Sequence, residues 1–272
     1  MNEKIPQSLE GISRTLLMTL YARARESQRA DGMIKDELAF SMVNQLDCDF
    51  SQLRMQRHDE IAVIMRMRKF DNHARDFLTR NPEAAVVHIG CGLDTRFERV
   101  DNGLVEWFDL DMPDVIDLRK KLINTVGDRY HLLASSVLEE GWINEVSHYK
   151  PRPFMFMAEG VFPYFEESQV KSLFLTLREH IPGSELVCDA HTPFVLWVDN
   201  LHLAKAKVNA RLYWSIKTGT DVEKWGDGIQ LLDEWNYYEE DEPRLKAFRW
   251  IRHIPAIAKS SGVYHYRLGC EQ

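Results

Sequence analysis

The chain has 272 residues, of which 44% are hydrophobic, a length that favours one large α/β domain with additions over two independent domains. Its net charge is −8, and its lysines and arginines form no basic stripe, so we expect no nucleic-acid partner. The first residues lack the apolar core of a signal peptide, and no apolar run approaches the roughly 18 residues of a membrane span. We therefore expect no membrane partner.

The first part of the chain has a helical pattern. Apolar residues recur at helical spacing from about residue 8 to residue 80, and proline is absent between Pro6 and Pro82. We expect residues 1–80 to form a helical N-terminal region.

Strands and helices then alternate. Short apolar and β-branched runs predict strands, and amphipathic segments between them predict helices. This alternation is typical of a mostly parallel, doubly wound α/β sheet, which we assign to a core of residues 81–192. The expected strands are 84–89, 105–110, 130–134, 154–158 and 186–190, and the expected helices are 114–123 and 166–180.

The last third of the chain adds further elements. An aromatic-rich, helical pattern covers 193–226, and we assign residues 193–228 to a helical insertion. Residues 229–272 read as a strand, a helix and a strand, in a single domain that covers 1–272. The expected elements of this last segment are a strand at 229–238, a helix at 243–259 and a strand at 263–268.

A glycine loop follows the first strand of the core, in the stretch VVHIGCGLDTR. Gly90 and Gly92 stand where a parallel sheet binds ligands, beyond the carboxyl end of a strand. A dinucleotide loop would have a third glycine where Thr95 stands, and the carboxylate of Asp94 would repel a pyrophosphate. The loop suits a ligand that carries a cation or hydroxyl groups; a nicotinamide cofactor and a turn without a ligand are the alternatives.

Two acids close the second strand. Asp109 and Asp111 follow Gly90 by 19 and 21 residues, a spacing that suits a carboxylate on a ribose diol. Alternation places both on the same side of the strand, so the spacing does not choose between them. A solvated strand end is the alternative.

A third acid and two arginines complete the set. Glu159 ends the apolar fourth strand, where a buried carboxylate needs a cationic partner, either a ligand ammonium or an arginine. Arg66 or Arg68, before the sheet, would supply a guanidinium fork to a carboxylate, unless both lie on a solvated helix face. S-adenosylmethionine has the ribose, the ammonium, the carboxylate and a cationic sulfonium that these groups would recognise.

Four motifs in this order resemble the leucine carboxyl methyltransferase family, in the bacterial branch that includes polyketide O-methyltransferases. The motifs are VVHIGCGLDTRFERV, WFDLDMPDVIDLRKKLI, ASSVLEEGWI and AEGVFPYFEESQVKSLF. The resemblance implies a class I, Rossmann-like methyltransferase with helical N-terminal and lid additions, and S-adenosyl-L-methionine as the cofactor.

The resemblance also implies roles for single residues. Arg66 would bind the methionine carboxylate, with Arg68 as second choice, and Glu159 would contact the methionine amine. Gly90 and Gly92, with Asp94 in the same loop, would pack against the methionine part. Asp111 would bind the ribose, and the role of Asp109, where the family often has glutamate, stays open. Ser135 and Ser136 replace the usual acid near the adenine, so we expect hydroxyl and backbone contacts from Ser136 and Val137.

The methyl acceptor is harder to predict from the sequence. The resemblance implies that residues 1–80 include the lid and that the insertion 193–228 lies over the acceptor site. We expect O-methylation of a small-molecule carboxylate or hydroxyl, for instance of a polyketide-like metabolite, with protein carboxyl methylation and a nicotinamide-dependent oxidoreductase as alternatives. A carboxylate acceptor needs no general base, whereas a phenol or alcohol would use one, such as His191 or His202. These histidines and Asp199 match no metal motif, so we expect no metal site.

The cysteines indicate the redox environment. No two of them form a CxxC pair or a zinc-binding spacing, so a reduced, cytoplasmic protein fits this usage better than a disulfide scaffold. The four are Cys48, Cys91, Cys188 and Cys270.

Overall fold

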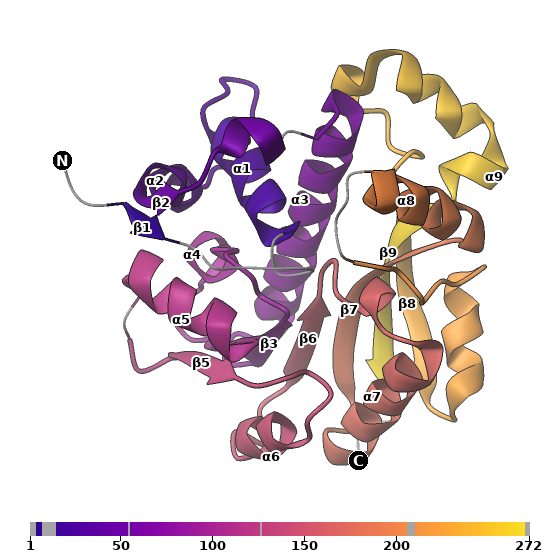
Figure 1. Cartoon of the computed structure of the whole chain (residues 1–272). Coiled ribbons are helices and arrows are strands. Elements are labelled where there is room, and N and C mark those ends of the chain that lie inside the picture. The colour runs from indigo at the N-terminus through magenta and orange to yellow at the C-terminus, as the bar shows by residue number, and fades with distance from the viewer. Residues whose placement is uncertain (1–3, 7–14, 54, 126, 206–209, 270–272) are drawn as a thin grey trace.

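A computed structural model describes residues 4–6, 15–53, 55–125, 127–205 and 210–269. Residues 8–14 of the expected N-terminal helical region and Cys270 lie outside the described residues. A seven-stranded sheet of order β5-β4-β3-β6-β7-β9-β8 forms the centre of the molecule (Figure 1). Strands β5, β4, β3, β6 and β7 are parallel, and β9 runs antiparallel to β7 and β8. The predicted mostly parallel, doubly wound sheet is therefore present.

The strands of this sheet agree closely with the expected ones. They are β3 (Ala85–Ile89), β4 (Glu106–Asp111), β5 (Tyr130–Ala134), β6 (Phe154–Ala158), β7 (Ser184–His191), β8 (Ile229–Asn236) and β9 (Ser261–Leu268). A separate small sheet pairs β1 (Ile5–Pro6) with β2 (Leu46–Asp47).

The helices differ more from the expectation. The α-helices of the described residues are α1 (Leu16–Ser27), α2 (Glu37–Gln45), α3 (Arg57–Arg80), α4 (Arg96–Val100), α5 (Pro113–Leu122), α6 (Gly141–Ser147), α7 (Glu167–His180), α8 (Pro193–Lys205) and α9 (Pro255–Ala258). Short 3-10 helices are η2 (Phe50–Leu53), η3 (Phe162–Tyr164), η4 (Gly219–Trp225) and η5 (Pro243–His253). In the view of Figure 1, α1 and α2 lie to the left of α3, and α8 and α9 lie to its right.

Two expected helices were wrong in extent. The segment 243–259 is not one helix: a 3-10 helix and α9 share it, and Lys246 has a positive φ of 52° that no continuous helix allows. Of the residues that the structure describes within 193–226, only α8 and η4 are helical, and residues 210–216 are irregular. The periodic apolar residues predicted burial there, but burial does not require a regular helix.

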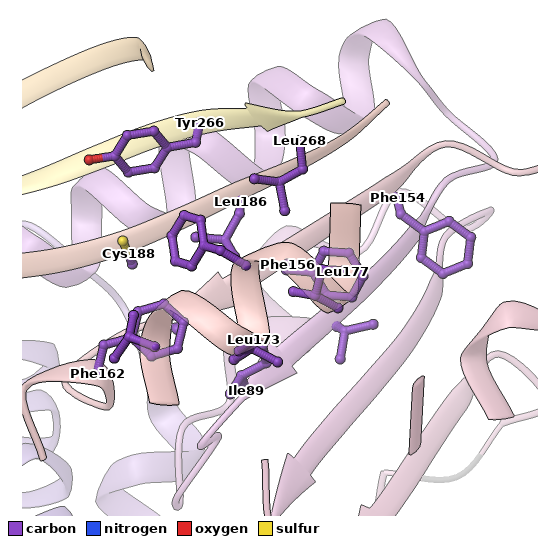
Figure 2. Packing of buried hydrophobic residues seen from close by; sticks show 14 of the residues in the cluster. Ile89, Phe154, Phe156, Phe162, Leu173, Leu177, Leu186, Cys188, Tyr266 and Leu268 are labelled. Carbon is purple, nitrogen blue, oxygen red and sulfur yellow. The ribbon is translucent and has the colours of Figure 1, made fainter. Parts of the chain in front are cut away.

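Alternating side chains divide the core into two layers. Ala85, Val87 and Ile89 pack with α6 and α7 on one face of β3, whereas Val86 packs with α3 on the other. Figure 2 shows the first layer, in which Leu173 and Leu177 of α7 lie among strand residues such as Leu186. Both faces of the sheet are covered, as parallel strands require.

A third apolar cluster joins the N-terminal helices to the core. Leu17 and Leu20 of α1 and Met42 of α2 pack with Val115 of α5 and with Leu93, which follows the glycine loop. The N-terminal region thus lies directly against the loop at the end of β3. None of the described helices is long and apolar enough to cross a membrane.

Candidate functional site

The expected site residues meet at the carboxyl ends of the parallel strands. Gly90 and Gly92 follow β3, and Gly160 follows β6; their φ angles are 63°, 52° and 67°, in the left-handed region that glycine adopts without strain. A Cβ atom on Gly90 would lie 2.4 Å from Cγ2 of Val161. The two loops therefore approach each other where only a bare backbone fits.

Asp111 stands at the end of β4, half-buried beside the glycine loop. Its Oδ2 accepts a hydrogen bond of 2.7 Å from the backbone N–H of Gly92, and its Oδ1 accepts one of 2.7 Å from that of Met112. Burial raises the pKa of the Asp111 carboxyl above its usual value, although both N–H groups oppose the shift. Two oxygens offer about four acceptor positions, so this carboxylate retains capacity for further donors.

Asp109 does not lie at a solvated strand end, which was the alternative that we considered for the two acids of this strand. Its side chain is buried and accepts hydrogen bonds from Trp107 Nε1 at 2.8 Å, from Tyr130 Oη at 2.5 Å and from the Arg119 guanidinium. Arg119 also donates to the backbone oxygens of Gly92 and Asp94, at 2.9 and 2.7 Å. Asp109 therefore supports the glycine loop through Arg119, and its oxygens are occupied inside the protein.

Asp94 also faces inward. Its carboxylate lies 3.1 Å from Nη2 of Arg96 and accepts a hydrogen bond of 2.8 Å from Nη1 of Arg99. Burial alone would raise the pKa of Asp94, but these two guanidinium groups, together with Arg23, outweigh burial and hold it well below its usual value. The negative charge of the loop is thus balanced by arginines of the protein. One of them is Arg96, which follows Asp94 by two residues in the sequence.

Glu159 is held by arginines from two directions. Its Oε1 accepts a hydrogen bond of 2.9 Å from Nε of Arg66, on α3, and its Oε2 accepts one from Nη2 of Arg96. Nη1 of Arg66 donates at 2.8 Å to Asp189, whose other oxygen accepts from the Gly160 N–H at 2.6 Å. Of the two partners that we considered for Glu159, the structure provides arginine.

Asp189 was missed by the sequence analysis. It lies near the end of β7, is fully buried and links Arg66 to the β6 loop. An acid inside the otherwise apolar run LVCDA was the available signal, because an unpaired buried carboxylate is costly. Arg68, our second choice to Arg66, instead pairs with Glu240 and lies on another side of α3.

Arg96 links several elements around the candidate site. Its fully buried guanidinium donates to Asp71 of α3 at 2.8 Å and lies 3.0 Å from Nε2 of His88, in addition to Asp94 and Glu159. Three carboxylates surround this group, and they raise its pKa although burial opposes the shift. Arg96 therefore stays charged and ties β3, α3 and the β6 loop together.

Ser136 and Val137 lie in the loop after β5. The neighbouring Ser135 donates its backbone N–H to the carbonyl oxygen of Asp111 at 3.0 Å, which places this loop beside the end of β4. Val137 is partly buried against the core, and its carbonyl oxygen accepts from Trp142 Nε1 at 3.2 Å. The loop after β5 thus lies near Asp111.

The two histidines near the expected acceptor side differ in setting. His191 ends β7, is partly buried, and its Nδ1 lies 2.8 Å from Oγ of Ser261. His202 is exposed on α8. Among the described residues, no group of three His, Cys, Asp or Glu side chains is arranged to hold a metal ion.

A family model described as leucine carboxyl methyltransferase matches residues 16–178. The tetracenomycin polyketide synthesis O-methyltransferase TcmP of Streptomyces glaucescens is 33% identical over 267 residues, which cover 95% of this chain and 97% of that protein. The S-adenosyl-L-methionine-dependent methyltransferase dpfgK of Gibberella zeae is 25% identical and covers 90% of this chain and 88% of its own length.

Solved structures show the same fold. A Thermobifida fusca protein assigned as a methyltransferase has a TM-score of 0.60 at 14% identity and covers 97% of this chain and 96% of its own. Magnesium protoporphyrin IX methyltransferase of Synechocystis, with bound S-adenosylhomocysteine, has a TM-score of 0.50 at 9% identity, covering 78% and 88%. The fold is that of class I methyltransferases, as the resemblance implied.

Proposed function

The chain belongs to the leucine carboxyl methyltransferase family, and from that premise we propose an S-adenosylmethionine-dependent O-methyltransferase that acts on a small-molecule carboxylate or hydroxyl. The observation that carries the proposal is the similarity to TcmP over nearly the whole of both chains. A polyketide-like metabolite is the acceptor class that this relative suggests. The nicotinamide alternative is not favoured, because both relatives are named methyltransferases.

The site has the features that S-adenosylmethionine requires. Gly90 and Gly92 leave the backbone bare at the end of β3, and Asp111 retains acceptor capacity beside them. When bound, this cofactor supplies a methyl group on a sulfonium, an electrophile that leaves behind a neutral thioether. The protein's task is then to bind, orient and desolvate.

We assign the binding roles as follows. Asp111 accepts the ribose hydroxyls, and the backbone of Gly90 and Gly92 packs against the methionine part. Arg66 binds the carboxylate, a role supported by its position between Glu159 and Asp189, which hold its fork in one orientation. Glu159 attracts the ammonium while Arg96 anchors it from behind.

The remaining assignments concern the adenine and the loop acids. Ser136 and Val137 form the adenine side, because their loop adjoins Asp111. Asp94 and Asp109 act through the arginines that they bind and do not touch the ligand.

Calorimetry with S-adenosylmethionine and S-adenosylhomocysteine tests the cofactor. The Asp111→Asn variant should weaken the affinity at least about tenfold, because hydrogen bonds from the ribose to a charged acceptor are worth about 1.5–3 kcal/mol. Asp117→Asn, an exposed acid on α5, is the matched control and should leave the affinity unchanged. No binding of either compound by the folded wild-type protein would remove the proposal.

Protein carboxyl methylation is the second candidate, which the name of the family model favours. Transfer of a radiolabelled methyl group from S-adenosylmethionine in a cell lysate separates the two. Label in low-molecular-weight products supports a small-molecule acceptor, whereas label in protein supports the alternative. Label in nucleic acid would contradict our exclusion of that partner, which rests on the net charge of −8.

The location and the division of the chain remain proposals. A cytoplasmic location is supported by Cys91 and Cys188, which form no disulfide among the described residues. We keep residues 1–80 as the N-terminal or lid region, 81–192 as the cofactor-binding core, 193–228 as the insertion over the acceptor site and 229–272 as the C-terminal segment. The contact of α1 and α2 with Leu93 supports the first of these divisions.

A further inference from the structure

Tyr237 lies at the same edge of the sheet as the proposed cofactor site. β8 runs antiparallel to β9, and β9 antiparallel to β7, so the carboxyl ends of β7 and β8 share this edge. Tyr237 directly follows β8, and its backbone N–H donates to the carbonyl oxygen of Ser261 at 3.1 Å. Its ring lies 6.4 Å from that of His191, the last residue of β7, and nearly perpendicular to it. The sequence analysis did not single out this tyrosine.

The side chain of Tyr237 packs on the face of the sheet that α3 covers. It belongs to the same apolar cluster as Ala62 and Phe70 of that helix. Arg66 stands midway between these two, and residues four apart along a helix lie in one row, which places Tyr237 against the row of Arg66. Burial raises the pKa of Tyr237 well above its usual value, and Arg66 is the group that opposes this shift most. The hydroxyl thus lies near Arg66 and keeps its hydrogen.

That hydrogen has no acceptor in the part of the chain that the structure describes. The side chain of Tyr237 is only 5% exposed, and its hydroxyl makes no hydrogen bond to the described residues. Arg66 cannot receive the hydrogen, because a guanidinium group only donates. Leaving a buried donor unpaired is costly, so native structures seldom do it without a reason. The hydroxyl therefore indicates an acceptor that comes from a ligand.

Arg66 in turn has one nitrogen left for a ligand. Nε donates to Glu159 and Nη1 donates to Asp189, whereas Nη2 makes no hydrogen bond to the described residues. Nη2 lies against the bare backbone of the β6 loop, where a Cβ on Gly160 would be 3.3 Å away. A carboxylate has two oxygens with about four acceptor positions, so Nη2 alone would leave most of them unfilled. A second donor beside Arg66 would complete the binding of a ligand carboxylate.

We propose that Tyr237 is a further cofactor-binding residue, whose hydroxyl donates to the methionine carboxylate together with Nη2 of Arg66. This inference rests on the proposed function. The carboxylate is then held between α3 and the end of β8, and it supplies the acceptor that the hydroxyl lacks. A neutral donor suits this place, because it adds no charge that would compete for Glu159 or Asp189.

Calorimetry with two ligands tests this role: S-adenosylhomocysteine, and its decarboxylated form, which keeps the ammonium and lacks the carboxylate. We expect Tyr237→Phe to weaken the affinity for S-adenosylhomocysteine about tenfold, because a hydrogen bond to a charged acceptor is lost. The same variant should bind the decarboxylated form as the wild type does. Tyr149→Phe is the matched control: its hydroxyl lies 3.4 Å from Nε2 of His131 at the opposite edge of the sheet, and both affinities should stay unchanged.

The stability of the ligand-free protein separates ligand binding from a structural role. Tyr237→Phe removes a buried polar group that has no partner, so the Tm of the free variant should equal or exceed that of the wild type. The increase in Tm on addition of S-adenosylhomocysteine should be smaller in the variant, because its affinity is lower. A lower Tm of the free variant would show that the hydroxyl supports the fold and would overturn the inference.

The remaining outcomes are also decisive. An equal loss of affinity for both ligands in Tyr237→Phe would mean that the residue does not act on the carboxylate, and an unchanged affinity for S-adenosylhomocysteine would remove its role altogether. Both results would leave the proposed function standing, since the wild type would still bind the cofactor. If the wild type binds neither S-adenosylmethionine nor S-adenosylhomocysteine, the proposed function fails and this inference fails with it.

Discussion

Arg96 and Glu159 form a buried ion pair that joins the two loops of the proposed site. Arg96 follows the glycine loop after β3, Glu159 follows β6, and their side chains are 0% and 6% exposed. The same guanidinium binds Asp71 and Asp94. The acid at the end of β6 therefore has its position set by the segment after β3 and by α3, and not by its own strand alone.

Removal of Arg96 should destabilise the protein strongly. The Arg96→Ala variant would leave the carboxylates of Asp71, Asp94 and Glu159 buried with too little positive charge, and breaking such pairs costs about 3–5 kcal/mol. Urea denaturation measures the loss in the free energy of unfolding. Arg249→Ala removes an arginine from an exposed pair with Asp241 and should change the free energy of unfolding much less, because solvent screens exposed pairs. Equal losses in the two variants would show that the Arg96 network contributes no special stability.

Gly90→Ala should be costly because the new Cβ has no space. It would lie 2.4 Å from Val161 in a backbone with a φ of 63°, so overpacking and the left-handed conformation together should cost about 2–4 kcal/mol. Gly103→Ala is the matched control, since its φ is 81° but nothing lies within 4 Å of the added atom. It should cost only about 1–2 kcal/mol. Thermal unfolding of both variants checks the difference. A similar decrease in Tm in both would mean that the Val161 side chain moves aside for the new atom.

Asp189→Asn should weaken cofactor binding, although we assign Asp189 no contact with the cofactor. The amide would keep the size of the side chain but remove the charge that holds Nη1 of Arg66 and would offer the Gly160 N–H a weaker acceptor. We expect an affinity for S-adenosylhomocysteine about tenfold lower by calorimetry. Asp233→Asn, whose carboxylate binds Lys69 at the surface, should bind normally. An unchanged affinity in Asp189→Asn would contradict the role given to Arg66.

His73 should make the protein sensitive to mild acid. Burial, with help from His265 and Lys69, lowers the pKa of His73 to about 3, whereas in the unfolded chain it is about 6.5. Between these values the unfolded state binds a proton that the folded state does not, so stability falls as the pH falls below about 6.5. The loss at pH 5 should reach about 2 kcal/mol.

His73→Gln should reduce the dependence by the contribution of His73, because glutamine does not titrate, whereas His191, whose pKa burial also lowers, still contributes. Denaturation at pH 7 and at pH 5 measures it in the wild type and the variant. His148→Gln, at an exposed position, should follow the wild type. If His73→Gln loses as much stability as the wild type between these pH values, another group causes the acid sensitivity.

The features that the sequence predicted well are local ones. The strand that precedes Gly90 and the acids at the end of β4 are visible as short runs of neighbouring residues. Lys246 shows the limit of this kind of inference. The periodic apolar residues around it predicted one helix, but its backbone has a positive φ of 52°, which interrupts the helix.

Asp189 and Arg66 show a second limit. They are 123 residues apart, and nothing in the spacing of either residue indicates the other. The partners of Glu159 come from α3 and from the loop after β3, so its pairing also depends on segments far apart in the chain.

The sequence by itself determined the positions of the strands along the chain, the bare glycine loop and the acids at the strand ends, because hydrophobic periodicity and backbone freedom are properties of adjacent residues. Only the tertiary structure showed how the environments of Asp109 and Asp111 differ. Arg119 and Tyr130 reach Asp109 and bury it, while Asp111 stays accessible beside Gly92. Burial and charge pairing arise when distant elements pack together, so the availability of a carboxylate for a ligand is a property of the fold.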